Sequence, residues 1–122
     1  MAGVDPAMVL RDGAPDLVFG SMGGDAQAQV HAQVLSAVID DGLDPQAAID
    51  APRWRVEPWD WRVRVEADLA PEVATALDAR GHQLVQVGAR DVGMGHAHAV
   101  AIRPHGYAVA TDPRAEGAAV GL

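Results

Sequence analysis

The sequence predicts an α+β fold, with mixed layers of helices and strands, in a single domain over residues 1–122. Apolar residues recur at three- and four-residue intervals over 26–41, the pattern of an amphipathic helix. Residues 62–66 alternate strictly between charged and apolar side chains, which is typical of a strand. Two pairs of short apolar runs are joined by turn residues at 11–13 and 104–106, which predicts one hairpin before the helices and one after them.

The first hairpin joins residues 7–10 to residues 17–20. Arg11-Asp12-Gly13 supplies residues that favour a tight reversal of the chain. These two segments are therefore expected to be neighbouring strands.

A glycine turn follows the second strand and leads into the first helix. Gly20-Ser21-Met22-Gly23-Gly24-Asp25 precedes the helix of residues 26–41, with Asp25 expected as its N-cap and Gly42 just past its end. Its buried face should consist of Val30, Val34, Leu35, Val38 and Ile39.

The middle of the chain predicts a short helix and an extended stretch. Asp44-Pro45 places an aspartate at the cap and a proline in the first turn, and Ala51-Pro52 ends the helix. Trp54 then begins an extended segment. In the alternating segment 62–66 the valines should face a core and the charges should face solvent or a partner subunit, near the edge of a sheet.

The last third predicts a helix over 71–80 that leads into a strand over 83–87. Residues 96–103 and 106–111 are then expected as strands joined at Pro104-His105-Gly106, because proline fixes φ and glycine permits the turn.

Composition excludes several classes of function. The net charge is −8 and all nine basic residues are arginines, which argues against binding to nucleic acids or anionic membranes. The chain has no cysteine, so thiol nucleophiles, disulfides and thiolate metal sites are excluded. Residues 1–122 contain neither a signal-peptide pattern nor an apolar run of membrane-spanning length, so the chain as given is expected to be cytoplasmic, and the localisation of a longer protein is left open.

The glycine turn is the first candidate site. Glycine N–H groups are not shielded by side chains, and the start of a helix favours negative charge, so the turn is suited to an anion or an oxyanion. A tight connection without any ligand is the alternative. A phosphate-binding loop does not fit, because no lysine follows the glycines.

His96 and His98 lie two residues apart on a predicted strand and should share one face, as two metal ligands would. A third ligand is not identified, although His31 or His105 could approach, so a polar, partly buried strand face is favoured over a metal site. The tryptophans Trp54, Trp59 and Trp61 are expected in a core or subunit contact rather than stacked on a ligand.

Arg53 and Arg114 each lie near an aspartate, Asp50 and Asp112, and are expected to form structural ion pairs or to cap carbonyl groups rather than to capture a substrate. Asp40-Asp41 is expected to form the solvated end of the first helix. A stand-alone hydrolase built on Ser21 or Ser36 is disfavoured, because Ser36 falls inside a helix and Ser21 has no assignable base.

Several motifs together resemble one family. The stretch GSMGGDAQAQVHAQVLSAVIDDGLDPQAAIDAPRW, the ending YAVATDPRAEG and the segment PAMVLRDG resemble the C-terminal part of the small subunit of γ-glutamyltranspeptidases and their acylase-like relatives. The resemblance covers residues 6–122, and Met22 with Asp25-Ala26-Gln27 is closer to the acylase-like branch. It implies half of the four-layer αββα sandwich of N-terminal-nucleophile hydrolases.

The resemblance also implies roles. Gly23 and Gly24 would donate backbone N–H groups to the substrate oxyanion beside Met22, and no metal or cofactor is implied. The family's nucleophile is a threonine released by self-cleavage, and neither Thr75 nor Thr111 occupies its position. The partner would be the large-subunit and N-terminal portion of the same protein, which would bind a small γ-glutamyl or related acyl amide.

We therefore expect the C-terminal domain of a γ-glutamyltranspeptidase-like amidohydrolase or acyltransferase, inactive by itself. The alternative is a non-catalytic binding or assembly module derived from the same family, which predicts a soluble domain or homodimer without amidase activity.

Overall fold

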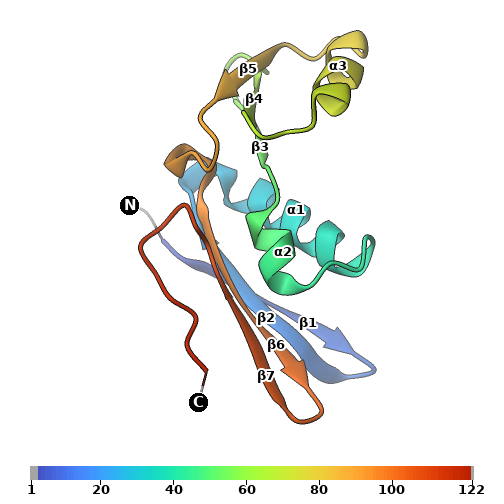
Figure 1. Cartoon of the computed structure of the whole chain (residues 1–122), viewed down its shortest axis with the longest axis vertical. Helices are drawn as coiled ribbons and strands as arrows, with labels where there is room; N and C mark the ends of the chain where they lie inside the picture. The colour runs from blue at the N-terminus through green and yellow to red at the C-terminus, as the bar shows by residue number, and fades with distance from the viewer. Residues whose placement is uncertain (1–2, 122) are drawn as a thin grey trace.

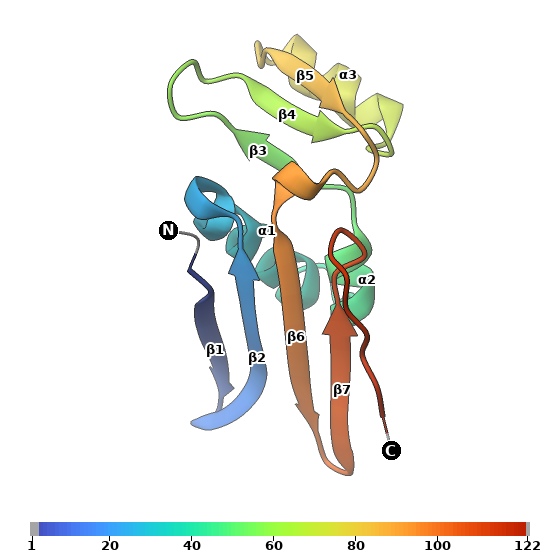
Figure 2. The same cartoon turned by 90° about the vertical axis from the view of Figure 1, so that its left-hand side faces the viewer.

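A four-stranded antiparallel sheet forms the larger part of the molecule. The computed structural model describes residues 3–121. The strands β1 (Asp5–Arg11), β2 (Ala14–Met22), β6 (His96–Arg103) and β7 (Gly106–Thr111) lie in the order β1-β2-β6-β7 (Figure 2). Both predicted hairpins are confirmed, with β1 and β2 longer than expected.

The backbone conformation of the turn between β1 and β2 explains why aspartate and glycine occur there. Asp12 and Gly13 both have positive φ, 53° and 81°, as a two-residue type I′ hairpin requires. Aspartate and glycine are among the residues that adopt this conformation most readily.

Two helices, α1 (Gln27–Ile39) and α2 (Pro45–Asp50), cover one face of this sheet (Figure 1). Leu17 and Phe19 of β2 pack with Val30 and Val34 of α1 in the core. The strands β6 and β7 contribute mainly alanines to this face, which leave room for the helices: Ala97, Ala99, Ala101 and Ala110.

The helix starts differ from each other. Asp44 caps α2 as predicted, since its Oδ1 accepts hydrogen bonds from the N–H groups of Gln46 and Ala47. The prediction that Asp25 caps the first helix is wrong: Gly24–Ala26 forms a short 3₁₀ turn, and Ala26 is the N-cap of α1 without a side-chain hydrogen bond.

A smaller sheet has the order β3-β4-β5, from β3 (Trp54–Val56), β4 (Val63–Glu66) and β5 (Leu84–Val87). The helix α3 (Pro71–Ala79) connects β4 to the parallel strand β5. The expectation that residues 62–66 lie near an edge is wrong, because β4 is the central strand. Glu66 is also not exposed as predicted; it is buried and accepts a hydrogen bond from Arg114.

The face of the larger sheet that points away from α1 and α2 is here called the outer face. The segment after β7 runs down beside β7 in Figure 2, and Gly117 in this segment lies against His98 and Thr111 of the outer face. Several large apolar side chains on the outer face are exposed: Met8, Met22, Val100, Tyr107 and Val109. None of the helices within residues 3–121 has the length and apolarity to cross a membrane.

Candidate active site

The glycine turn lies where β2 ends and the chain enters α1. Gly24 has φ +55°, a left-handed conformation that favours glycine, and a Cβ at this position would meet no atom within 4 Å. The N–H of Ala26 donates to the carbonyl of Gly23 at 3.1 Å and closes the turn. The side-chain amide of Gln27 donates to the carbonyl of Ser21 at 2.9 Å, which ties the end of β2 to the first turn of α1.

The N–H groups of Gly23 and Gly24 are the candidate oxyanion donors of this turn. Within residues 3–121, neither group donates a hydrogen bond to a backbone or side-chain acceptor. Met22 is the last residue of β2, pairs with His96 across the ladder and is 38% exposed on the outer face. A cavity of about 460 Å³ begins beside it and is lined also by His96, His98 and Glu116.

Gly95 supports the turn from behind. A Cβ built on Gly23 would lie 3.2 Å from the Cα of Gly95, and one built on Gly95 would lie 3.0 Å from the carbonyl oxygen of Met22. Gly95 also has φ +80°, so both space and conformation favour glycine there. Gly95, the residue before β6, therefore packs directly against the turn that carries the candidate oxyanion donors.

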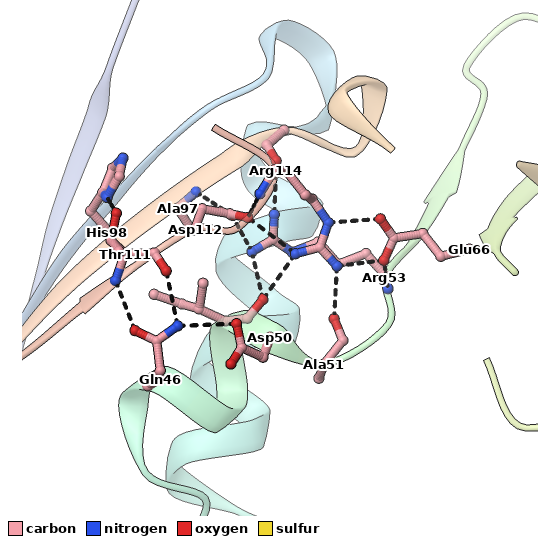
Figure 3. Close-up of polar contacts among 12 residues, drawn as sticks. Gln46, Asp50, Ala51, Arg53, Glu66, Ala97, His98, Thr111, Asp112 and Arg114 are labelled. Atoms are coloured by element: carbon pink, nitrogen blue, oxygen red, sulfur yellow. Dashed lines mark hydrogen bonds and ion pairs between the residues drawn. The ribbon is translucent and has the colours of Figure 1, made fainter. Parts of the chain in front are cut away.

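A buried ionic cluster adjoins this region (Figure 3). Arg53 Nη2 lies 2.7 Å from Asp112 Oδ2, Arg114 Nη1 lies 3.2 Å from Asp112 Oδ1, and Arg114 also pairs with Glu66. The prediction of structural ion pairs is confirmed, but Arg53 does not use Asp50. Asp50 instead accepts a hydrogen bond from Gln46 Nε2.

The cluster joins both sheets to α2. Arg114 donates to the carbonyls of Ile49 and Ala51, at the end of α2, and Glu66 supplies its carboxylate from β4. Asp112 accepts from the N–H of Ala97 at 2.7 Å, next to the start of β6. Glu66 was missed by sequence reasoning, because its place in an alternating charged strand is the pattern of a solvent-facing residue.

The charges in the cluster shift one another's pKa values. Burial alone would raise the pKa of Asp112, but the charge of Arg53 and hydrogen bonds from the N–H groups of Arg114 and Ala97 hold this pKa below its ordinary value. Burial lowers the pKa of Arg53 despite the neighbouring Asp112. Burial would also lower the pKa of Arg114, but Glu66 raises it above the ordinary value.

The histidines do not converge. His96 and His98 share the outer face as predicted, and His98 Nδ1 lies 3.1 Å from Thr111 Oγ1. His31 is on α1, on the other side of the sheet, where its ring meets Phe19 at a centroid distance of 4.8 Å, and His105 is in the β6–β7 turn. In the part of the chain that the structure describes, no three His, Asp or Glu side chains form a group able to hold a metal ion.

The remaining candidates are dispersed. The expectation of a core role for the tryptophans is wrong, since Trp54 on β3 and Trp59 and Trp61 in the β3–β4 connection are 38%, 70% and 77% exposed. A role in a subunit contact stays a prediction. Ser21 is buried and its hydroxyl has no partner among the described residues, and the Ser36 hydroxyl donates to Asp40 Oδ2 at 2.8 Å. Neither hydroxyl is hydrogen-bonded to a histidine among the described residues.

Comparison with known proteins identifies the family that the sequence motifs resemble. The family model described as Gamma-glutamyltranspeptidase matches residues 1–122. A glutathione hydrolase-like proenzyme of Bacillus subtilis is 36% identical over 96% of this chain, and an oxamate amidohydrolase proenzyme of Klebsiella pneumoniae is 34% identical over 97%. The chain spans only 23% of the length of each.

Solved structures show the same fold. A cephalosporin acylase from Bacillus halodurans superposes with a TM-score of 0.83 and 38% identity over 93% of this chain and 21% of its own. A γ-glutamyltranspeptidase from Pseudomonas nitroreducens, complexed with L-DON, gives 0.82 and 29% identity over 100% of this chain and 63% of its own. The α+β layers therefore belong to an N-terminal-nucleophile hydrolase fold, and the chain belongs to the γ-glutamyltranspeptidase family.

Proposed function

We propose that this chain is the C-terminal, oxyanion-stabilising part of an amide hydrolase or acyltransferase. The observation that carries the proposal is the pair of N–H groups of Gly23 and Gly24, which lie on a turn at the end of β2 and have no acceptor within residues 3–121. Two preorganised donors of this kind stabilise the oxyanion of a tetrahedral intermediate, and each contributes roughly 3–4 kcal/mol to transition-state stabilisation.

The remaining chemistry is assigned to a longer form of the protein. A threonine exposed by self-cleavage would attack the amide carbonyl, form an acyl-enzyme and pass the acyl group to water or an amine. The Thr75 hydroxyl donates to the carbonyl of Pro71, and the Thr111 hydroxyl contacts His98, so neither takes the place of the nucleophilic threonine. The exposed outer face of the larger sheet is the surface that we assign to the remainder of the protein.

The substrate class follows from the relatives. A γ-glutamyl amide such as glutathione, oxamate and the side-chain amide of a cephalosporin are the three candidates that their names supply. All three contain an amide carbonyl that becomes an oxyanion on attack. No metal or organic cofactor is part of this proposal.

The test is made on the full-length protein, purified after maturation. N-terminal sequencing should find two chains, the second beginning with threonine and containing residues 6–122. Assays with glutathione, oxamate and a cephalosporin should show cleavage of at least one amide, and rapid quenching followed by intact-mass analysis should find the acyl group on the threonine chain. An uncleaved protein that hydrolyses none of the three would favour the non-catalytic module instead.

A further inference from the structure

The segment before β6 is held by charged side chains at both ends. The N–H of Asp91 donates to Glu66 Oε1 at 2.9 Å, and Arg55 Nη1 donates to the carbonyl of Gly93 at 3.1 Å. At the end that touches the glycine turn, Arg53 Nη1 donates to the carbonyl of Gly95 at 2.8 Å. This last bond is buried, since Arg53 is only 2% exposed.

Arg53 also has fixed partners on its other nitrogen. Its Nη2 lies 2.7 Å from Asp112 Oδ2 and donates to the carbonyl of Ile49 at 3.3 Å. A guanidinium presents separate donors in a rigid fork, so it reaches Gly95 and Asp112 at the same time. The single ammonium nitrogen of a lysine cannot reproduce both arms of this fork.

We propose that Arg53 is a positioning residue for the oxyanion turn, acting through Gly95 on Gly23. The proposal rests on the function proposed above. Three contacts link Arg53 to the turn: Asp112 fixes Arg53, Arg53 fixes the carbonyl of Gly95, and the Cα of Gly95 lies so near Gly23 that a Cβ on Gly23 would be only 3.2 Å away. Because oxyanion donors act only when correctly aimed, displacement of Gly95 should reduce the rate of the chemical step rather than substrate binding.

The matched pair of variants is Arg53→Lys and Arg114→Lys. Both change a buried arginine of the same cluster and keep its charge, but Arg114 makes no hydrogen bond to residues 91–95. In the matured full-length protein, assayed on whichever amide the wild type cleaves, Arg53→Lys should lower kcat by about 10- to 100-fold and leave KM within about twofold. Arg114→Lys should lower the unfolding temperature to a similar extent, but it should lower the kcat of the folded protein less than Arg53→Lys does, because Arg114 reaches residues 91–95 only through Glu66 and Asp112.

A second readout does not depend on activity. The amide of Ala26 donates to Gly23, so its hydrogen exchange reports on the turn. Exchange in a peptide containing Ala26 should be faster in Arg53→Lys than in the wild type or in Arg114→Lys. If the wild type cleaves no amide, the proposed function fails, and this exchange comparison still decides whether Arg53 positions the turn.

A third variant covers the case in which Arg53→Lys does not fold. Gly95→Ala leaves the ionic cluster intact but places a methyl group 3.0 Å from the carbonyl oxygen of Met22, and it should reproduce the loss of kcat. Its control is Gly88→Ala, where a Cβ meets nothing within 4 Å. Equal losses of kcat in the two lysine variants, or unchanged kcat in Gly95→Ala, would overturn the inference.

Discussion

Gly23 and Gly24 are adjacent, but a methyl group should affect them differently. At Gly23 the new Cβ would lie 3.2 Å from the Cα of Gly95 and displace the turn, whereas at Gly24 the space is open and only the φ of +55° is unfavourable. Gly23→Ala should therefore lower kcat by about 100-fold, the effect of losing one oxyanion donor. Gly24→Ala should cost about 1 kcal/mol of stability and a smaller part of kcat.

These two variants are measured side by side, by steady-state kinetics and by urea unfolding of the full-length protein. Equal kinetic losses in both would contradict the role assigned to Gly95 as the support of the turn.

Asp112 should make the free energy of unfolding depend on pH in the acidic range. Its pKa is depressed in the folded state relative to about 3.9 in the unfolded chain, so its carboxylate contributes stability above that value and the contribution is lost as the pH falls through the folded pKa. The free energy of unfolding should therefore decrease between about pH 5 and the folded pKa. Urea titrations at a series of pH values measure this.

Asp112→Asn is the control for this dependence. It should be less stable at pH 7 by about 3–5 kcal/mol, because Arg53 loses its buried counter-charge, and its stability should fall less steeply in acid. An equally steep fall in Asp112→Asn would assign the acid sensitivity to other carboxylates.

The packing of α1 and α2 on the sheet depends on small side chains. Ala99 is 3% exposed and belongs to the core with Val30, Val34 and Ile49. Ala99→Val should destabilise the protein by about 1–3 kcal/mol, because the added methyl groups force the helices away from β6. The same substitution at the exposed Ala89 should change the free energy of unfolding by less than about 0.5 kcal/mol, which chemical denaturation of both variants would show.

Elements defined by local chemistry were predictable from the sequence. The β1–β2 turn, the cap of α2 and the bounds of β6 and β7 follow from residues within a few positions of one another. The central place of β4 was not predictable, because it depends on pairing with β5 across α3. The burial of Glu66 likewise depends on Arg114, which is distant in sequence.

At the candidate site, too, the local features were predictable from the sequence and the long-range contacts were not. The glycine turn was recognisable from adjacent residues, and its role came from the family resemblance. Gly95 and the Arg53–Asp112 pair were not linked to it, since their contact with the turn arises only when β2 and β6 pair.

The whole molecule carries an apolar surface that we expect to be covered. Met8, Val100 and Tyr107 are 56%, 36% and 75% exposed on the outer face. The chain expressed alone should therefore self-associate, and sedimentation velocity should show species larger than a monomer. Coexpression with the rest of the protein should instead give a one-to-one complex. A monodisperse, inactive monomer or homodimer would favour the stand-alone module.

The strand order also constrains how the protein folds. Each hairpin closes through a short local turn, on a timescale of about 1–10 μs, whereas β2 and β6 are separated by residues 23–95 and must overcome the entropy of closing a long loop. Gly23 follows β2 and Gly95 precedes β6, so the contact between them forms only at this late step. The oxyanion turn should therefore acquire its geometry in the same kinetic phase that completes the sheet. A folding intermediate in which the two hairpins have formed but not paired would lack the geometry that catalysis requires.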